Sequence, residues 1–295
     1  MAAEWQGKSR GTVLGYKIFM FFMKNVGIEA AYFILYFVAA YFCLFSKDST
    51  KSIYYYFRHR LKYSKFKSIL NIYNSYYVFG QTILDKIAIN SGLSNKFNYT
   101  SYASGLINEA LKEKKGIILI SAHVGNFEVA EFFFSNLEQS ASISLLTTDV
   151  EHSKIKDYLT SVSKRSSINF IIIREDLSHI FEINAALARN EIVCITGDRY
   201  FKGSKYLNEE LLGKEAKFPA GPFLLASRLK APVLFVYVMK EPKMHYQLYA
   251  TKSQAKHRDA QAILKEYVES VTGMLKKYPL QWFNYFDFWN VFKKQ

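Results

Sequence analysis

Cysteine, proline and glycine are all scarce in this chain, whose 295 residues include two cysteines, five prolines and 14 glycines. Cys43 and Cys194 both lie in apolar surroundings. We therefore expect two small buried side chains in a reducing compartment. The sequence contains no internal repeat, no low-complexity tract and no linker rich in proline, glycine or serine. A disulfide framework and a repeat array are thereby excluded.

Several motifs that would carry chemistry are also missing. The sequence has no Cys/His cluster with metal-ligand spacing, no G-x-G-x-x-G that opens a helix after a strand, no Walker loop and no G-x-S-x-G elbow. The sequence therefore gives no motif that would indicate structural zinc, nucleotide-dependent transfer by a known loop or lipase-type serine chemistry.

Acidic residues are outnumbered, because 25 Asp and Glu stand against 39 Lys and Arg, which gives a net charge of +14. Half of the residues are hydrophobic. A chain of this length can therefore bury a core as one large or two small domains, and intrinsic disorder is excluded for most of it. Aromatic residues make up 17%. Basic and aromatic residues together are typical of membrane-interface proteins and also of single-strand nucleic-acid binders, and composition does not choose between them.

Two apolar runs stand near the N-terminus, at residues 18–23 and 30–45. The second run has sixteen residues without a charge. As a helix it would span about 24 Å, a little under the roughly 30 Å of a bilayer core. It predicts a short or tilted anchor, an interfacial helix or a buried helix. A cleaved signal peptide is disfavoured, because the run starts late and is too long.

Basic residues interleaved with aromatic ones follow this run, and Asp48 is the only acid among residues 47–67. Basic residues beside an apolar helix favour the cytoplasmic side of a membrane and attract anionic headgroups. The interleaved aromatics favour an interfacial helix over a merely solvated face. We therefore expect residues 1–95 to form a helical membrane-associating region. The basic residues are Lys47, Lys51, Arg58, Arg60, Lys62, Lys65 and Lys67, and the aromatic ones are Tyr54, Tyr55, Tyr56, Phe57, Tyr63 and Phe66.

From about residue 100, apolar runs of strand length alternate with helical stretches. This alternation predicts an α/β domain with a mostly parallel sheet over residues 96–295. Strands are expected over 116–120, 142–147, 168–173, 191–196 and 232–238, with a further one near 246–250. Helices are expected over 126–135, 153–163, 177–189, 222–228 and 259–277.

The segment SAHVGNFEVA, residues 121–130, directly follows the first of these strands. Active residues of open α/β sheets gather at the carboxyl ends of strands, which is where His123 stands. Glu128 follows five positions later. An acid that faces one imidazole nitrogen leaves the other able to accept a proton. The pair therefore predicts a base for a hydroxyl or amine nucleophile, with a structural histidine as the alternative.

A histidine, four residues and an acid after an apolar strand resemble the first motif of the lysophospholipid and glycerolipid acyltransferase superfamily. The form HVGNFE resembles the branch of the lipid A biosynthesis (lauroyl/myristoyl) acyltransferases. The closing YPLQWFNYFDFW, residues 278–289, resembles the Pro and Trp motif of that branch. The resemblance covers almost the whole chain and implies a glycerolipid acyltransferase-like α/β sandwich with an N-terminal apolar membrane-associated helix. The segments that agree in order between these two motifs are IIIRED with Arg174, GDRY with Asp198 and Arg199, KFPAGP with Phe218, Pro219 and Gly221, and APVLFVYV.

The resemblance also implies roles for these residues. His123 would be the catalytic base and Glu128 the acid that orients it. Backbone N–H groups near Gly125 or Gly221 would stabilise the oxyanion. Neither a metal nor a cofactor is implied. The substrate-binding candidates are Asn126, Arg174, Asp198, Arg199, Lys217, Phe218, Pro219 and Gly221.

Each of these binding candidates has a structural alternative. Arg174 could hold a phosphate or be a surface charge at a strand end. Asp198 and Arg199 could bind the acceptor, order the site or form an internal salt bridge. The KFPAGP segment could present Lys217 and backbone donors to an anion or be a plain turn. The aromatic C-terminus could wall an acyl groove, rest on lipid or pack in the core.

The resemblance implies a membrane-associated O-acyltransferase that moves a fatty acyl chain from acyl carrier protein, or less favourably coenzyme A, to a hydroxyl of lipid A or a related glycolipid. The basic surplus suits a membrane surface, a phosphate-bearing acceptor and an acidic carrier protein. The expected location is the cytoplasmic face of the inner membrane of a Gram-negative bacterium. The sequence gives no indication of the oligomeric state.

Three alternatives remain at this point. Phe286 to Trp289 stand where the lipid A enzymes tend to have basic residues, which leaves open an amino-acid lipid, a phospholipid or a polyene lipid as acceptor. An acyltransferase-like scaffold without activity is the second alternative. The third is a nucleic-acid-binding protein, which would leave the N-terminal apolar helix unexplained.

Overall fold

A computed structural model describes residues 13–129, 142–147, 168–174, 176–200 and 203–292. Helices α1 to α4 make up the N-terminal quarter, and both apolar runs of the sequence lie in helices. The expected helix at 153–163 and most of the one at 126–135 lie outside the described residues. The N-terminal elements are α1 (Val13–Asn25), α2 (Ile28–Phe45), α3 (Lys47–Tyr55), the π-helical turn η1 (Tyr56–Arg60), α4 (Lys65–Ala88), and the short turns η2 (Ile89–Leu93) and η3 (Ser94–Lys96).

The centre of the molecule is a seven-stranded sheet in the order β1-β9-β8-β2-β5-β3-β4. Every neighbouring pair is parallel except β8 with β9, so the mostly parallel sheet expected from the sequence is confirmed. The strands are β1 (Asn98–Ser101), β2 (Ile117–Ser121), β3 (Ile143–Thr147), β4 (Ile168–Ile172), β5 (Ile192–Thr196), β8 (Val233–Glu241) and β9 (His245–Lys252). An antiparallel pair that the sequence did not predict, β6 (Tyr206–Glu210) with β7 (Glu215–Pro219), stands apart from this sheet.

Helices cover both faces of the sheet, and strand β2 shows why. Ile118 and Ile120 belong to the core cluster that contains residues of α8, α9 and α10. Ile117 and Leu119 belong to the cluster that contains residues of α1, α5 and the second half of α4, whereas the first half of α4 contributes to the other cluster. Alternate side chains of a buried strand point to opposite faces, so both faces need an apolar cover. The remaining helices are α5 (Ser104–Lys112), α8 (His179–Ala188), α9 (Ala220–Arg228) and α10 (Ala260–Lys277), which is followed by the turn η5 (Pro279–Gln281).

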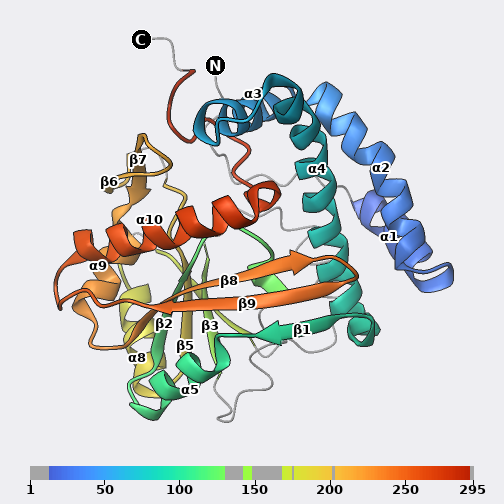
Figure 1. The fold of residues 1–295 in the computed structure, drawn as a ribbon. Coiled ribbons are helices and arrows are strands. Elements are labelled where there is room, and N and C mark those ends of the chain that lie inside the picture. Colours follow the sequence, from blue (N-terminus) through green and yellow to red (C-terminus); the bar gives the residue numbers. More distant parts are fainter. Residues whose placement is uncertain (1–12, 130–141, 148–167, 175, 201–202, 293–295) are drawn as a thin grey trace.

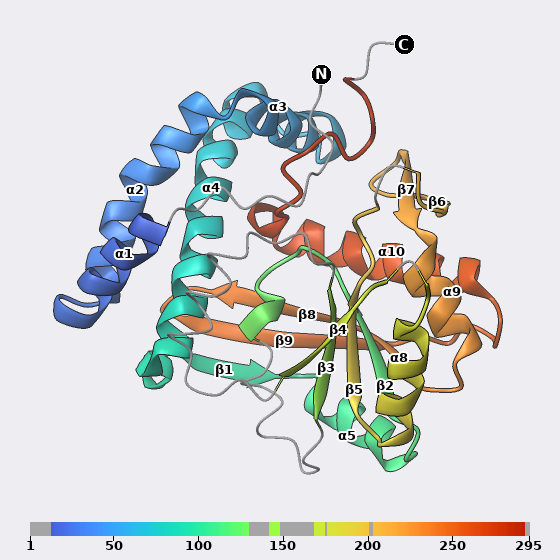
Figure 2. The same cartoon turned by 180° about the vertical axis from the view of Figure 1, so that it is seen from behind.

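Helix α4 joins the N-terminal helices to the sheet. It stands beside the ends of β8 and β9, with α1 and α2 on its outer side, and both views show these two helices at the opposite side of the molecule from α9 (Figures 1 and 2). The basic stretch at 47–67 is not one helix, because residues 61–64 separate η1 from α4. The predicted division of the chain at residues 95 and 96 falls just before β1 and stays a prediction.

Helix α2 lies very close to α4 at one point. A Cβ placed on Gly80 of α4 would come within 2.4 Å of Leu35 Cδ1 on α2. One helical turn away, the rings of Tyr36 and Tyr77 stack with their centroids 4.4 Å apart. Leu35 is buried while much of the outer face of α2 is exposed. Because Gly80 has no side chain, α2 can pack closely against α4 at this point.

We expect Gly80→Ala to weaken the packing of α2 on α4, because the added methyl group displaces Leu35. Gly273→Ala is the matched control, since Gly273 lies in α10 and its Cβ would meet nothing within 4 Å. Alanine in an exposed helix interior stabilises by about 1 kcal/mol relative to glycine. Chemical unfolding in mild detergent should show a higher free energy of unfolding for Gly273→Ala and a lower one for Gly80→Ala. An equal gain in both variants would contradict the close packing of α2 on α4.

Candidate active site

The site begins with the pairing of two neighbouring strands. Strands β2 and β5 are parallel and in register, with Ser121 opposite Thr196. Two residues beyond each strand end come His123 and Asp198, so the register carries both to the same edge of the sheet. The carboxyl ends of parallel strands are where α/β folds build their sites.

His123 and Asp198 are joined by two hydrogen bonds. The ring Nδ1 of His123 lies 2.7 Å from Asp198 Oδ1. The backbone N–H of His123 donates to Asp198 Oδ2 at 2.9 Å. Asp198 is buried, whereas the His123 side chain is 30% exposed. The carboxylate thus holds the imidazole from the inside, and the ring reaches the surface of the site.

The electrostatics fix the role of each group. Burial raises the pKa of Asp198, but the charge and hydrogen bonds of His123, together with Arg199, outweigh it and lower the pKa to about 2. The carboxylate is therefore ionised at neutral pH and can only accept, so Nδ1 of His123 carries the hydrogen. In the neutral imidazole the lone pair then resides on Nε2, the nitrogen that can take a proton from another group.

The chain after His123 is held on both sides. Gly125 has φ +70°, and a Cβ there would come within 2.2 Å of the Val238 carbonyl oxygen on β8, so both conformation and space require glycine. Its N–H donates to the Gln281 carbonyl at 2.8 Å, and the Asn126 N–H donates to the Val238 carbonyl at 2.7 Å. The Gly125 and Asn126 N–H groups are therefore both engaged within the protein, and the expectation of oxyanion donors near Gly125 or Gly221 stays a prediction.

The aromatic C-terminal segment wraps over the site. Val124 pairs with Trp282, and the Phe283 N–H donates to the His123 carbonyl at 2.8 Å. Trp282, Phe283, Phe288 and Trp289 are buried. Of the roles left open for this segment, core packing is the one that these side chains have here, and the backbone supports His123.

Arg199 and Asn284 complete the support of Asp198. Asn284 Nδ2 donates to Asp198 Oδ2 at 2.8 Å, and its Oδ1 accepts from Arg199 Nε at 2.8 Å. Arg199 also donates to the Phe283 carbonyl at 3.0 Å. Burial lowers the pKa of Arg199 to about 10, although Asp198 opposes this. Arg199 is still a cation at neutral pH, and its contacts hold Asn284 and the Phe283 backbone beside Asp198. Its role in substrate binding stays a prediction.

Asn126, expected to bind substrate, lies in the interior. Its Nδ2 donates to the Thr82 carbonyl at 2.9 Å and to the Tyr246 hydroxyl at 3.2 Å. Both partners belong to the protein and come from α4 and β9. The observed contacts of Asn126 therefore anchor the segment that carries His123.

The KFPAGP segment forms the end of β7 and the start of α9. Phe218 is buried against the rings of Tyr267 and Phe288. Pro219 is the residue before α9, and Gly221 lies in its first turn. Lys217 is half-buried, with its ammonium 4.2 Å from the centre of the Tyr206 ring. It also lines a cleft of about 290 Å³, together with Tyr200, Glu215, Ala216, Trp289 and Asn290.

Arg174 follows β4, which is an edge strand of the sheet. Strands β5 and β3 lie between β2 and β4, so β4 is three strand spacings from β2. At about 4.8 Å per strand this is roughly 14 Å from the strand end that carries His123. The exposed guanidinium pairs with Glu182 Oε1 at 2.6 Å and donates to Ser178. Among the described residues, the structure brings His123, Asp198 and Arg199 together and leaves Arg174 apart.

Glu128 lies in a 3-10 turn, η4 (Phe127–Val129), and its side chain lies outside the described part of the structure. Its predicted role as the partner acid of His123 stays a prediction. Sequence reasoning missed Asp198 as the direct partner of His123, and it missed Asn284 altogether. The signal for Asp198 was available, because equal offsets from two strand ends bring residues together if those strands are neighbours.

Comparison with known proteins places the chain in a family. No curated protein matches the sequence. The family model described as bacterial lipid A biosynthesis acyltransferase matches residues 8–290, which include every element of the site above. The chain therefore belongs to the bacterial lipid A biosynthesis acyltransferase family and is an acyltransferase.

Proposed function

We propose that this acyltransferase moves a fatty acyl chain from acyl carrier protein to a hydroxyl group of lipid A or a related glycolipid, with His123 as general base. One observation carries the catalytic part of the proposal. His123 stands at the carboxyl end of β2 with Nδ1 held by a buried, ionised carboxylate, 2.7 Å away. A histidine held in this way can accept a proton at Nε2, and the resulting imidazolium is stabilised by the carboxylate.

The proposed reaction uses Nε2 of His123 twice. Nε2 of His123 takes the proton of the acceptor hydroxyl as its oxygen attacks the carbonyl carbon of the acyl thioester. The new C–O bond forms, and collapse of the tetrahedral intermediate breaks the C–S bond. The proton on His123 then passes to the departing thiolate. General-base catalysis of this kind needs no metal and no cofactor beyond the thioester.

Glu128 is proposed as the second acid of the site, on the strength of the family resemblance. Asp198 already occupies Nδ1, so the two carboxylates have different tasks. Asp198 sets the tautomer, and Glu128 is proposed to help orient His123 and to stabilise the positive charge that the ring gains on protonation. With the Gly125 and Asn126 amides engaged, the first turn of α9 at Gly221 is the remaining proposed source of oxyanion donors.

The acceptor is proposed to lie along the cleft that Lys217 and Trp289 line. An ammonium group suits a phosphate, and Tyr200 supplies a flat surface of the kind that sugar rings contact. Pro219 and Gly221 are proposed to shape the substrate side of the start of α9. Asn126, which hydrogen-bonds to the Thr82 carbonyl, and the buried Phe218 are proposed to support the substrate site from within the protein. Arg174, at the far strand, is proposed to meet the phosphopantetheine or the acidic carrier protein.

Charge supports the choice of donor. The chain carries +14, which suits an acidic carrier protein, and acyl carrier protein is proposed as the donor because the family resemblance implies it. A nucleic-acid partner has no particular observation in its favour and is not proposed.

Helix α2 is proposed to bind the enzyme to the cytoplasmic face of the inner membrane. It is the one described helix long and apolar enough to cross a membrane, with a mean hydropathy of 1.9, yet only 22% of its residues are buried. Its inner face packs on α4 through Leu35 and Ala39. Its outer face exposes Phe33, Tyr36, Phe37, Tyr41, Leu44 and Phe45, and α4 adds Phe66, Ile69 and Leu70. An apolar face beside the basic residues of α3 and α4 is typical of a helix that lies on the membrane surface.

The first prediction from this proposal concerns the two residues that the family motif places in the chemistry. His123→Ala and Glu128→Ala should each abolish acyl transfer, with a fall in kcat of about 10³-fold or more, because the first removes the base and the second removes the acid proposed to orient and charge it. The measurement is mass spectrometry of an under-acylated lipid A incubated with myristoyl acyl carrier protein. Unfolding curves serve as the control for the fold, and near-wild-type turnover in either variant would refute the role of that residue.

The second prediction tests Asp198. Asp198→Asn keeps the shape of the side chain but can donate to Nδ1, which moves the imidazole hydrogen to Nε2 and disables the base. Such a tautomer change costs about 10⁴-fold in kcat in a serine protease, and we expect a loss of about 10³-fold or more here. Glu191→Gln is the matched control, because Glu191 is a buried carboxylate at the opposite end of the same strand. Equal losses in the two variants would point to a general structural effect.

The third prediction tests membrane binding by α2. Phe33→Ser combined with Phe37→Ser should reduce binding to vesicles of phosphatidylethanolamine and phosphatidylglycerol by about 100-fold, because two large apolar side chains no longer enter the lipid. Phe181→Ser is the control, since Phe181 is 79% exposed but lies on α8, away from α2. Vesicle sedimentation measures the effect. Unchanged binding of the double variant would mean that another surface of the protein binds the membrane.

A further inference from the structure

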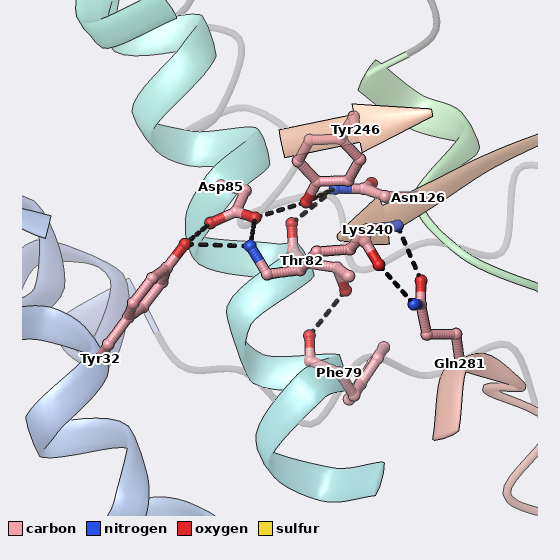
Figure 3. Close-up of polar contacts among 8 residues, drawn as sticks. All are labelled: Tyr32, Phe79, Thr82, Asp85, Asn126, Lys240, Tyr246 and Gln281. Atoms are coloured by element: carbon pink, nitrogen blue, oxygen red, sulfur yellow. Dashed lines mark hydrogen bonds and ion pairs between the residues drawn. The ribbon is translucent and has the colours of Figure 1, made fainter. Parts of the chain in front are cut away.

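A buried carboxylate on α4 gathers groups from several elements. Asp85 is completely buried and accepts hydrogen bonds from Tyr32 on α2 and from Tyr246 on β9. The ammonium of Lys240, on β8, lies 2.5 Å from Asp85 Oδ2 and is itself buried. The same ammonium donates to the Tyr32 hydroxyl at 3.2 Å. Figure 3 shows these side chains converging on Asp85 from three directions.

Stability alone does not account for this cluster. Burying a carboxylate and an ammonium costs several kcal/mol each, and apolar replacements of buried pairs are often neutral or stabilising. Three donors on one carboxylate do fix the relative position of the elements that supply them. Here those elements are α2, β8 and β9.

The cluster is connected to the segment that carries His123 by two routes. In the first, the Tyr246 hydroxyl donates to Asp85 and accepts from Asn126 Nδ2 at 3.2 Å. In the second, the Lys240 backbone exchanges two hydrogen bonds with the Gln281 side chain, at 2.9 and 2.7 Å. The Gln281 carbonyl in turn accepts from the Gly125 N–H at 2.8 Å. Figure 3 shows both routes leaving the same cluster.

The Tyr246 hydroxyl is well suited to its place. Burial, and then the charge and hydrogen bond of Asp85, raise the pKa of Tyr246 well above its ordinary value. The hydroxyl therefore keeps its hydrogen and gives it to Asp85, which leaves an oxygen lone pair to receive the Asn126 amide.

We propose that Asp85 is a positioning residue for acyl transfer: through Tyr246 and Lys240 it fixes Asn126 and Gly125, and so the placement of His123. The proposal rests on the proposed function, in which His123 is the base. Asp85 lies behind the segment and acts only through other residues. Small displacements of a reacting group are costly, because a shift of about 1 Å can reduce a rate by about 10²-fold.

The chain offers a matched pair of variants to test this. Tyr32→Phe and Tyr246→Phe each remove one phenolic donor from the same carboxylate, but only Tyr246 contacts Asn126. Direct replacement of Asp85 would strand the Lys240 charge in the interior and endanger the fold, so the tyrosines are the better targets. Glu191→Gln controls for the loss of a buried polar contact far from the site.

The kinetic arm uses full-length protein with myristoyl acyl carrier protein and an under-acylated lipid A in micelles. Tyr246→Phe should lower kcat about 10-fold with little change in either KM, while Tyr32→Phe should have a clearly smaller effect. Combining Tyr246→Phe with Asn126→Ala should cost no more than the larger single loss, because both act through one contact. Equal losses for both tyrosines, or additive losses in the double variant, would overturn the proposal in favour of a purely structural cluster.

The second arm does not depend on activity. Amide hydrogen exchange in residues 122–129 should be about 10-fold faster in Tyr246→Phe and unchanged in Tyr32→Phe and Glu191→Gln. Unchanged exchange in Tyr246→Phe would refute the positioning role even if transfer slowed. If the wild-type protein transferred no acyl chain while Tyr246→Phe still loosened this segment, the proposed function would fail and the link from Tyr246 to the His123 segment would stand.

Discussion

The hydrogen bond between His123 and Asp198 depends on the parallel register of β2 and β5, and much of the structure serves to maintain it. A buried carboxylate is stable only when its oxygens are provided with donors. Asp198 receives the His123 ring, the His123 N–H and the Asn284 amide. Because Asn284 belongs to the last part of the chain, satisfying this one carboxylate requires the C-terminal segment to return across the site.

That return explains the concentration of aromatic residues near the C-terminus. Trp282 pairs with Val124, and its ring contacts those of Phe288 and Trp289 at centroid distances of 5.1 and 5.3 Å. A short segment without a helix or strand of its own is held in place by large rings that bury apolar area at a small entropic cost. Aromatic residues therefore occur in two settings, packed in the core beside the site and exposed on the outer face of α2.

Much of the fold could be predicted from the sequence because it is encoded locally. The runs at 116–120, 191–196 and 232–238 became β2, β5 and β8 within one to three residues at either end, since β-branched runs of that length carry their own signal. The hairpin β6–β7 was missed because its strands, YLNEE and EAKFP, are rich in charged residues and lack an apolar run. Only one face of β7, with Ala216 and Phe218, is buried, so the strand needs no such run.

The site was less predictable, because its contacts join residues far apart in the chain. His123 was identified from its position after a strand, but its partner at Nδ1 lies 75 residues away. Proximity in sequence drew attention to Glu128, whereas sheet order determines which strand end adjoins β2. Asn126 was assigned to substrate because it stands in the motif, and only the packing of α4 and β9 shows its link to Thr82 and Tyr246.

Asp85 and Asp198 show how one physical solution serves two ends. Each is a buried carboxylate that accepts from three donors, and each contacts a residue of the segment that follows β2 either directly or through one hydroxyl. They differ in the partner. Asp198 faces a histidine whose side chain is 30% exposed, so the imidazole can meet a substrate while the carboxylate stabilises the imidazolium of the proposed transfer. Asp85 faces a buried lysine and two phenols that lie behind the segment, so it can only hold geometry. The chemistry and the exposure of the partner, rather than the burial of the acid, separate a carboxylate suited to proton transfer from one suited to positioning.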